Sequence, residues 1–439
     1  MSRRKPLPQA LELDVSALDE SFFGEAEHVT DTVRREVRLR NALAGEHVVA
    51  RILKRRRGVW FGNAEQVTSP SPQRRTPPCD FFPRCGGCAS QHLDGSQQLA
   101  AKERELAALL EAAGVQAARW RAAVTGPQFG YRRKARLGVR QVGERLFVGF
   151  RESFGNRVVD MSSCLTLDAR LSRLIQPLIQ QLSQVSVRRA IPQVEVACGD
   201  DAVVVVIRHL EPLTEDDRRL LVDLEQRTGA VIGVQPGGYD SVRDLRGDRC
   251  PLLRYAIADF GLTLEFEATS FTQVNVAMNA ALVRHAAHAL DGLLDVVDLF
   301  CGNGNFSLAL ARRGARVLGV EGSVESVARA QANAELNQLT NLTRFEAADL
   351  YGKEAAHLAL PESATGWVMD PPRSGAGPHL ARWLTPGLER IAYVSCQPAT
   401  FAADARVLQD AGFNLTEVGI FDMFPQTAHV ETLGVFQRR

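Results

Sequence analysis

The sequence lacks any long hydrophobic run, and it is poor in cysteine and in net charge. Its longest uninterrupted apolar stretch, AVVVVI at 202–207, is far shorter than the roughly 18 residues that a membrane-spanning helix needs. The first residues, MSRRKPLPQALELD, are basic, but no apolar segment follows them, which argues against a secretory signal peptide. We therefore expect a cytoplasmic protein with no membrane partner, in which the 8 cysteines are reduced rather than paired in disulfides.

The net charge of only +1 conceals an uneven distribution of basic residues. Residues 51–150 hold 18 basic and 7 acidic side chains, whereas residues 151–439 hold 27 basic and 35 acidic ones. A solvated basic face is the simplest explanation, but so strong a concentration beside an acidic remainder favours a polyanionic partner. We expect this block to bind nucleic acid.

A chain of 439 residues is too long for one hydrophobic core, so two or three domains are expected. Residues 8–67 form short segments with apolar residues at every second position, which predicts a small all-β, OB-like barrel. Within it, the run RILKRRRGVWFG places cations next to Trp60 and Phe61. That combination suits phosphates and stacked bases, although both rings could equally be core residues. The composition of residues 68–78 is that of a linker.

The rest of the chain divides into two further domains. Residues 75–265 predict a mixed α+β central domain, with an amphipathic helix at 97–115 and several short strands after it. In residues 266–439, strands and helices alternate, which predicts an α/β domain of the Rossmann-like class with a doubly wound parallel sheet.

Four cysteines have a spacing that suits a metal centre. Cys79, Cys85 and Cys88 form a C-x5-C-x2-C array, and Cys164 is the candidate fourth ligand. Structural zinc usually takes paired C-x2–4-C knuckles, whereas three clustered thiolates with one distant partner favour a 4Fe-4S cluster. Spacing alone leaves zinc, or no metal at all, as alternatives.

The stretch DVVDLFCGNGNFSLALARRGARVLGVEGS at 295–323 is typical of a strand, a glycine-rich turn, a helix and a second strand. Gly302 and Gly304 let the backbone approach a ligand closely, and Glu321 ends the second strand, where nucleotide folds bind ribose hydroxyls. A serine stands where a dinucleotide fingerprint has its third glycine. The pattern D-x-F-x-G-x-G-x-F instead resembles the S-adenosylmethionine site of Rossmann-like methyltransferases, with Asp349 expected near the adenine. The alternative is a glycine turn in an unrelated α/β sheet.

Two further strands end on polar side chains, GWVMD at Asp370 and IAYVSC at Cys396. A lone cysteine is most often a small packed residue. The carboxyl ends of parallel strands line one crevice, however, so we expect both side chains to face the cofactor. A thiolate there could add to C6 of a uracil whose N3–H is held by Asp370, so that C5 becomes able to take a methyl group. The base that removes the C5 proton could be His429, Glu431, Asp259 or Glu267.

Five motifs occur in order along the chain: FTQVN at 271–275, DLFCGNGNF, DPPRSG, YVSCQPAT and MFPQTAHVE. Together they resemble the RNA uracil-5 methyltransferase family. The resemblance implies that Cys396 is the nucleophile and Glu431 the base, and that Asp370 touches the uracil. It implies S-adenosyl-L-methionine as cofactor, held by Gln273, Phe300, Asn305, Glu321, Asp349 and Asp370, and a 4Fe-4S cluster held by Cys79, Cys85, Cys88 and Cys164.

The N-terminal barrel resembles the TRAM domain of this family, and YRRKARLGVR at 131–140 resembles the RNA-facing segment of its central domain. A chain with both barrel and cluster resembles the branch that acts on 23S rRNA. This implies 5-methyluridine formation at one uridine by a monomer that flips its target base. Another rRNA uridine or a tRNA is an alternative substrate, and an RNA-binding iron–sulfur assembly protein is a non-enzymatic alternative. A cytosine-5 methyltransferase is disfavoured, because DPPRSG has no cysteine after its prolines.

Overall fold

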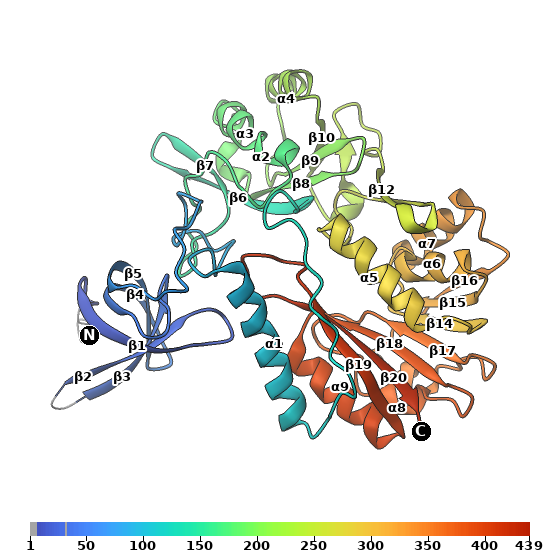
Figure 1. Ribbon diagram of the computed structural model, residues 1–439. Helices are drawn as coiled ribbons and strands as arrows, with labels where there is room; N and C mark the ends of the chain where they lie inside the picture. Colours follow the sequence, from blue (N-terminus) through green and yellow to red (C-terminus); the bar gives the residue numbers. More distant parts are fainter. Residues whose placement is uncertain (1–6, 31–32) are drawn as a thin grey trace.

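The computed structural model describes residues 7–30 and 33–439, which form a barrel, a central domain and a larger α/β domain (Figure 1). The start of the chain, on which the signal-peptide prediction depends, falls partly in residues 1–6 and so lies outside the described residues. None of the described helices combines the length and the apolar character needed to cross a bilayer.

The first five strands close into a barrel in the order β1-β2-β3-β5-β4. They are β1 (Leu11–Leu18), β2 (Gly24–Thr30), β3 (Val33–Arg40), β4 (His47–Arg56) and β5 (Val59–Ser69). Side chains alternate between the inside and the outside, and the core is made of small and branched apolar residues, among them Leu13, Val37, Leu39, Val48 and Ile52. The predicted N-terminal barrel is thereby confirmed.

The segment after the barrel leads through the cysteine loop, residues 79–88, to helix α1 (Gly95–Ala112). The composition of residues 68–78 predicts a linker, but the structure fixes this segment to the barrel. Arg74 is only 16% exposed and makes an ion pair at 2.6 Å with Glu46, whose side chain is fully buried. A charged pair in this setting holds its partners together because separating them would leave a buried carboxylate uncompensated.

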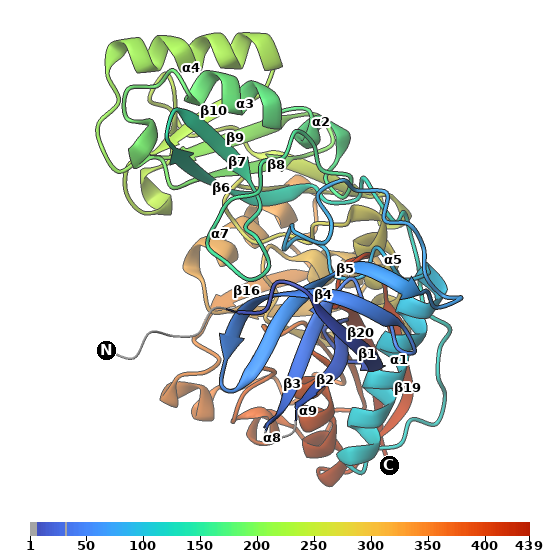
Figure 2. The ribbon, with the colours of Figure 1, turned by 90° about the vertical axis from the view of Figure 1, so that its left-hand side faces the viewer.

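The central domain is built on a six-stranded sheet in the order β11-β10-β9-β8-β6-β7. The strands are β6 (Lys134–Val142), β7 (Arg145–Gly149), β8 (Gln193–Cys198), β9 (Val203–Arg208), β10 (Val231–Gln235) and β11 (Arg243–Asp244). Helices α3 (Ile175–Leu182) and α4 (Glu215–Thr228) lie together on one side of this sheet (Figure 2), after the short α2 (Ala169–Ser172). Because β9 is buried on both faces, its sequence, VVVVIR, is a nearly continuous apolar run.

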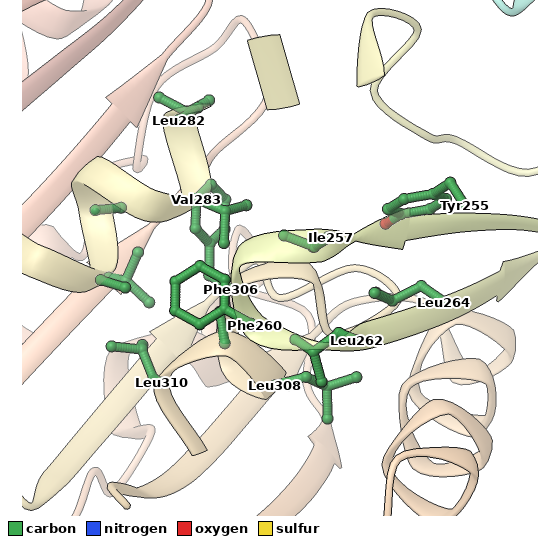
Figure 3. Close-up of a cluster of buried hydrophobic side chains, with 14 of the residues drawn as sticks. Tyr255, Ile257, Phe260, Leu262, Leu264, Leu282, Val283, Phe306, Leu308 and Leu310 are labelled. Carbon is green, nitrogen blue, oxygen red and sulfur yellow. The ribbon is translucent and has the colours of Figure 1, made fainter. Parts of the chain in front are cut away.

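A hairpin of two strands, β12 (Leu253–Ile257) and β13 (Leu262–Phe266), follows the central sheet. Its apolar side chains pack against helices α5 (Val276–Ala289) and α6 (Asn305–Arg312), as Figure 3 shows. The hairpin therefore shares the hydrophobic core of the α/β domain and covers the helix that follows the glycine-rich turn.

The α/β domain contains a seven-stranded sheet in the order β16-β15-β14-β17-β18-β20-β19. The strands are β14 (Asp295–Leu299), β15 (Arg316–Glu321), β16 (Thr343–Ala347), β17 (Gly366–Met369), β18 (Arg390–Ser395), β19 (Phe413–Phe421) and β20 (Glu431–Arg438). Strands β14 to β18 pair in parallel, and β20 runs antiparallel between β18 and β19. The predicted doubly wound sheet is confirmed, and its strand order reverses between β14 and β17, where such sheets bind ligands.

The helices of this domain are α7 (Val324–Leu336), α8 (Leu380–Trp383) and α9 (Pro398–Asp410), besides α5 and α6. Short 3-10 helices occur at Arg188–Ala190, Tyr239–Ser241, Ala258–Phe260 and Lys353–His357.

Helix α1 packs on the α/β domain although it precedes the central sheet in sequence. Its Leu106 and Leu110 are buried in the same cluster as Phe401 of α9. The chain after it runs along β19, where backbone N–H groups of residues 118, 121 and 124 donate to carbonyls of that strand at 2.8–2.9 Å. The domain limits at residues 75, 265 and 266 stay predictions. Helix α1, which the sequence assigns to the central domain, contributes to the core of the α/β domain.

Candidate active site

The turn after β14 contains three residues with positive φ angles, Phe300 at 63°, Gly302 at 55° and Gly304 at 89°. Glycine takes this left-handed conformation without steric cost, which allows helix α6 to begin at the next residue. The N–H of Gly302 donates to Glu321 Oε2 at 3.2 Å, and the N–H of Ser323 donates to Oε1 at 3.0 Å. The carboxylate of Glu321 is thus fixed beside the turn at the end of β15.

The side chain of Asn305 is committed to contacts within the protein. Its Oδ1 accepts hydrogen bonds from Tyr255 Oη and Asn279 Nδ2, each at 3.0 Å, and its Nδ2 donates to Asn279 Oδ1 at 2.8 Å. Asn305 is only 9% exposed. A contact between Asn305 and a cofactor would therefore go through its backbone at the start of α6.

Aromatic and acidic side chains lie at the same edge of the sheet. The rings of Phe300 and Tyr351 lie 5.8 Å apart, and Asp349 Oδ1 accepts the N–H of Tyr351 at 2.9 Å. Sequence reasoning missed Tyr351, for which the only signal is its position two residues after Asp349. Together with Glu321, these groups come from the ends of three neighbouring strands, β14, β15 and β16.

Beneath the turn, Asp298 of β14 is completely buried. Ser307 Oγ donates to its Oδ2, while Oδ1 has no hydrogen-bond partner among the described residues. Burial raises the pKa of this carboxyl to about 7, despite the opposite effect of the Ser307 hydrogen bond. Asp298 therefore holds a proton over much of the acidic to neutral range.

The three residues predicted to act on the substrate stand at adjacent strand ends. Asp370 follows β17, Cys396 follows β18, and Glu431 begins β20. Strands β18 and β20 pair with Ser395 opposite Thr432, and this register brings the next positions, 396 and 431, side by side. The predicted cofactor segment reaches the same place, since Gln273 Nε2 donates to Asp370 Oδ2 at 3.3 Å.

The charges of these groups act on one another. Burial, together with the carboxylates of Glu431 and Asp370, raises the pKa of the Cys396 thiol to about 11, against the lowering effect of Arg373. Burial and the charge of Asp370 raise the pKa of Glu431 well above its usual range, and burial raises that of Asp370 to about 7. In the described part of the chain, Glu431 Oε2 has no hydrogen-bond partner. When ionised, a carboxylate with a raised pKa is a stronger base than an exposed one.

The other base candidates have different surroundings. Asp259 and Glu267 form ion pairs with arginines of α5 and α7, at 2.6 and 2.7 Å. His429 Nε2 lies 3.2 Å from Arg373 Nη2, and partial burial with the Arg373 charge lowers the pKa of its imidazole. Arg373, in the DPPRSG motif, is a second functional candidate that sequence reasoning missed, although it stands three residues after Asp370.

The four cysteines predicted as cluster ligands are free thiols, and the charges of Cys164, Cys85 and Cys79 all act on Cys88. Burial raises the pKa of Cys85 to about 11, and the charges of Cys164 and Cys79 add to this effect. Among the described residues, no group of three or more His, Cys, Asp or Glu side chains is close enough to hold a single metal ion. A 4Fe-4S cluster holds its cysteine sulfurs farther apart than one ion does, so the cluster stays a prediction.

The two predicted RNA-facing regions differ in what their cations contact. In the segment 131–140, Arg133 and Arg136 make ion pairs with acidic residues of the central domain. At the tip of the β4–β5 hairpin, Arg55 and Arg56 are exposed. The exposed tip is therefore the more accessible of the two to a phosphate backbone.

Comparisons with known proteins bear on the family of this chain. Residues 94–439 match the family model described as tRNA (Uracil-5-)-methyltransferase. The proteins named 23S rRNA (uracil(1939)-C(5))-methyltransferase RlmD from Hahella chejuensis and Acidithiobacillus ferrooxidans are similar to this chain. The first is 41% identical over 99% of each chain, and the second is 40% identical over 100% of each chain.

The fold has a counterpart among solved structures. The crystal structure of Pyrococcus abyssi tRNA (uracil-54, C5)-methyltransferase in complex with S-adenosyl-L-homocysteine superposes with a TM-score of 0.73. The alignment covers 97% of this chain and 100% of that one, with 23% sequence identity, so it speaks to the fold. On the family model and the full-length relatives together, the chain belongs to the tRNA (uracil-5-)-methyltransferase family.

Proposed function

We propose that this protein transfers a methyl group from S-adenosyl-L-methionine to C5 of one uridine in 23S rRNA, at the position that its relatives' names give as uracil 1939. It would act as a monomer in the cytoplasm. The observation that carries the proposal is the convergence of Asp370, Cys396 and Glu431 at neighbouring strand ends. Binding RNA alone does not need a thiol between two carboxyls whose pKa values are raised, which argues against a non-enzymatic role.

Cys396 is the proposed nucleophile. Having lost its proton to solvent, its sulfur forms a bond to C6 of the flipped uracil, and the electrons of the C5–C6 double bond move into an enolate. Asp370, which accepts a hydrogen bond from Gln273, is the proposed acceptor of the ring N3–H. Arg373 lowers the pKa of Cys396 and so favours the thiolate that this addition needs.

Glu431 is the proposed base for the second half of the reaction. Once C5 carries the methyl group, it still bears its proton, and Glu431 removes that proton. The electron pair restores the C5–C6 double bond, the bond from C6 to sulfur breaks, and Cys396 leaves as a thiolate. The proton then passes from Glu431 to solvent, so each turnover releases one proton. The raised pKa of Glu431 makes it a stronger base for this step.

The residues at the glycine-rich turn suit the proposed cofactor. Glu321 is fixed by two backbone N–H groups and keeps lone pairs for ribose hydroxyls, while the ring of Phe300 offers an aromatic face. Asn305, Asp349 and Gln273 complete the proposed binding set, with Asp370 shared between cofactor and substrate. When bound, S-adenosyl-L-methionine supplies the methyl group that C5 takes up.

The donor set around the cysteine loop fits an anionic 4Fe-4S cluster held by Cys79, Cys85, Cys88 and Cys164. Arg40 of the barrel is 4% exposed and donates to the carbonyl of Cys88. It lies close enough to Cys85 and Cys88 for the charges of their thiolates to act on its pKa. Its Nε has no hydrogen-bond partner in the part of the chain that the structure describes. A buried cation of this kind needs a compensating negative charge, which a cluster with four thiolate ligands supplies.

The test is methyl transfer from labelled cofactor to unmodified 23S rRNA, with tRNA as the competing substrate. Wild-type protein is expected to label 23S rRNA, Cys396→Ala to label nothing, and Glu431→Gln to trap a protein–RNA adduct that survives denaturation. Labelling of tRNA instead of rRNA would move the substrate to the tRNA branch. Full activity of Cys396→Ala would overturn the mechanism.

A further inference from the structure

The loop between β19 and β20, residues 422–430, leads directly to Glu431 and is fixed by segments distant in sequence. Lys102 of α1 donates from Nζ to Asp422 Oδ1 at 2.8 Å, and Tyr131 donates from Oη to a loop carbonyl at 2.9 Å. Figure 1 shows this red loop meeting the end of α1 beside the blue cysteine loop. The position of Glu431 therefore depends on contacts made far from its own strand.

Gln426 is the residue at which the cysteine loop contacts the 422–430 loop. Its carbonyl accepts hydrogen bonds from the N–H groups of Ala89 and Ser90, at 2.8 and 3.2 Å, and these two residues directly follow the last cysteine of the array. Its side chain is equally engaged. Oε1 accepts from Gln98 Nε2 at 3.1 Å, and Nε2 donates to Gln128 Oε1 at 3.0 Å.

The backbone of Gln426 is held in a conformation that glutamine rarely adopts. Its φ angle is 67°, in the left-handed region, and the residue is 6% exposed. Such a conformation persists where the surroundings over-determine it, and here hydrogen bonds from three separate segments do so. Since glycine would take this φ angle with less strain, the side chain is what glutamine adds at this position.

We propose that Gln426 is a positioning residue that transmits the order of the cluster-loaded cysteine loop to Glu431. The task of the cluster in this enzyme is then to hold the catalytic base in place beside Cys396. This inference rests on the proposed function. Four thiolates bound to one cluster fix the backbone of the cysteine loop and hence the N–H groups of Ala89 and Ser90. Without that restraint the 422–430 loop is held less firmly at the Gln426 carbonyl, while the cofactor turn after β14 keeps its own contacts.

The first arm of the test follows the lifetime of the protein–RNA adduct with unmodified 23S rRNA and labelled cofactor. Gln426→Ala keeps the carbonyl that Ala89 and Ser90 contact but loses the side-chain hydrogen bonds to Gln98 and Gln128. It is therefore expected to prolong that lifetime about tenfold, with KM for the cofactor unchanged. Gln426→Gly relieves the φ angle but lacks the same side-chain bonds, so it is expected to behave like the alanine variant. Gln409→Ala is the matched control, because that side chain donates to the carbonyl of Gly114 rather than to the 422–430 loop.

The second arm measures amide hydrogen exchange in the holoenzyme before and after iron is removed by oxidation and chelation. Removal is expected to raise exchange in residues 422–430 at least about tenfold, as Gln426→Ala does in the holoenzyme, while helix α9 exchanges as before. This readout does not depend on activity of the loaded enzyme.

The outcomes separate this inference from the proposed function. Unchanged exchange in 422–430 after iron removal overturns the link to the cluster. Normal adduct resolution by Gln426→Ala, together with a trapped adduct in Glu431→Gln, overturns the positioning role and leaves the proposed function standing. No methyl transfer by wild type and no adduct in Glu431→Gln overturns the proposed function itself.

Discussion

Replacing Glu431 with glutamine tests whether its carboxyl faces the Cys396 thiol. After burial, the Glu431 carboxylate is the strongest influence that raises the pKa of Cys396 to about 11. A thiol with that pKa is ionised to only about one part in 1,000 at pH 8, and each pKa unit removed raises this fraction about tenfold. Glutamine keeps the shape without the charge. We therefore expect Glu431→Gln to lower the pKa of Cys396 and to increase its thiolate fraction several-fold, up to about tenfold.

The assay is alkylation of Cys396 by iodoacetamide from about pH 7 to pH 10, read by peptide mass spectrometry, because only the thiolate reacts. Wild-type labelling is expected to rise about tenfold per pH unit over this range, and the curve for Glu431→Gln to lie at lower pH. Glu389→Gln is the matched control, since that carboxylate precedes β18 at its opposite end. Coincident curves for all three proteins would refute the placement of Glu431 beside the thiol.

Asp298→Asn is expected to raise Tm by an amount that grows from about pH 4 to about pH 7 and stays constant above that. Burial raises the pKa of this carboxyl to about 7, so its contribution to wild-type stability is complete below about pH 4 and is lost as the pH rises through about 7. A gain in Tm that is the same at pH 4 and at pH 8 would contradict this. Lys102→Met leaves Asp422 buried and unpaired and is expected to lower the free energy of unfolding in denaturant by about 3–5 kcal/mol. Adding Asp422→Asn to this variant is expected to recover most of that loss, whereas additive losses in the double variant would argue against the ion pair. Alanine at both Arg55 and Arg56 is expected to weaken binding to specific and unrelated RNA alike and to reduce the salt slope of Kd by about one or two; an unchanged slope would exclude phosphate contacts there.

The sequence was sufficient for those parts of the fold in which local pattern determines structure. Alternation at every second residue predicts the barrel, and alternating strands and helices predict the seven-stranded sheet. The rule that ligands bind at the carboxyl ends of parallel strands predicts from the sequence that Asp370 and Cys396 line the same crevice. The sequence could not choose among the base candidates, because that choice depends on the antiparallel register of β18 and β20, which places Glu431 next to Cys396.

What the sequence could not supply is the set of contacts between segments that lie far apart in the chain. Gln426 and Gln98 are 328 positions apart, and Gln426 and Gln128 are 298 apart, so no local pattern marks them as partners. The alternating pattern of its segment likewise predicts that Arg40 lies in a barrel strand. That pattern does not predict the hydrogen bond that Arg40 donates to the Cys88 carbonyl in the cysteine loop. These contacts join the barrel, the cysteine loop and the loop before Glu431 into one connected path. The proposed base, Glu431, needs such a path, because strand β20 fixes its register but not the entry of the chain into that strand.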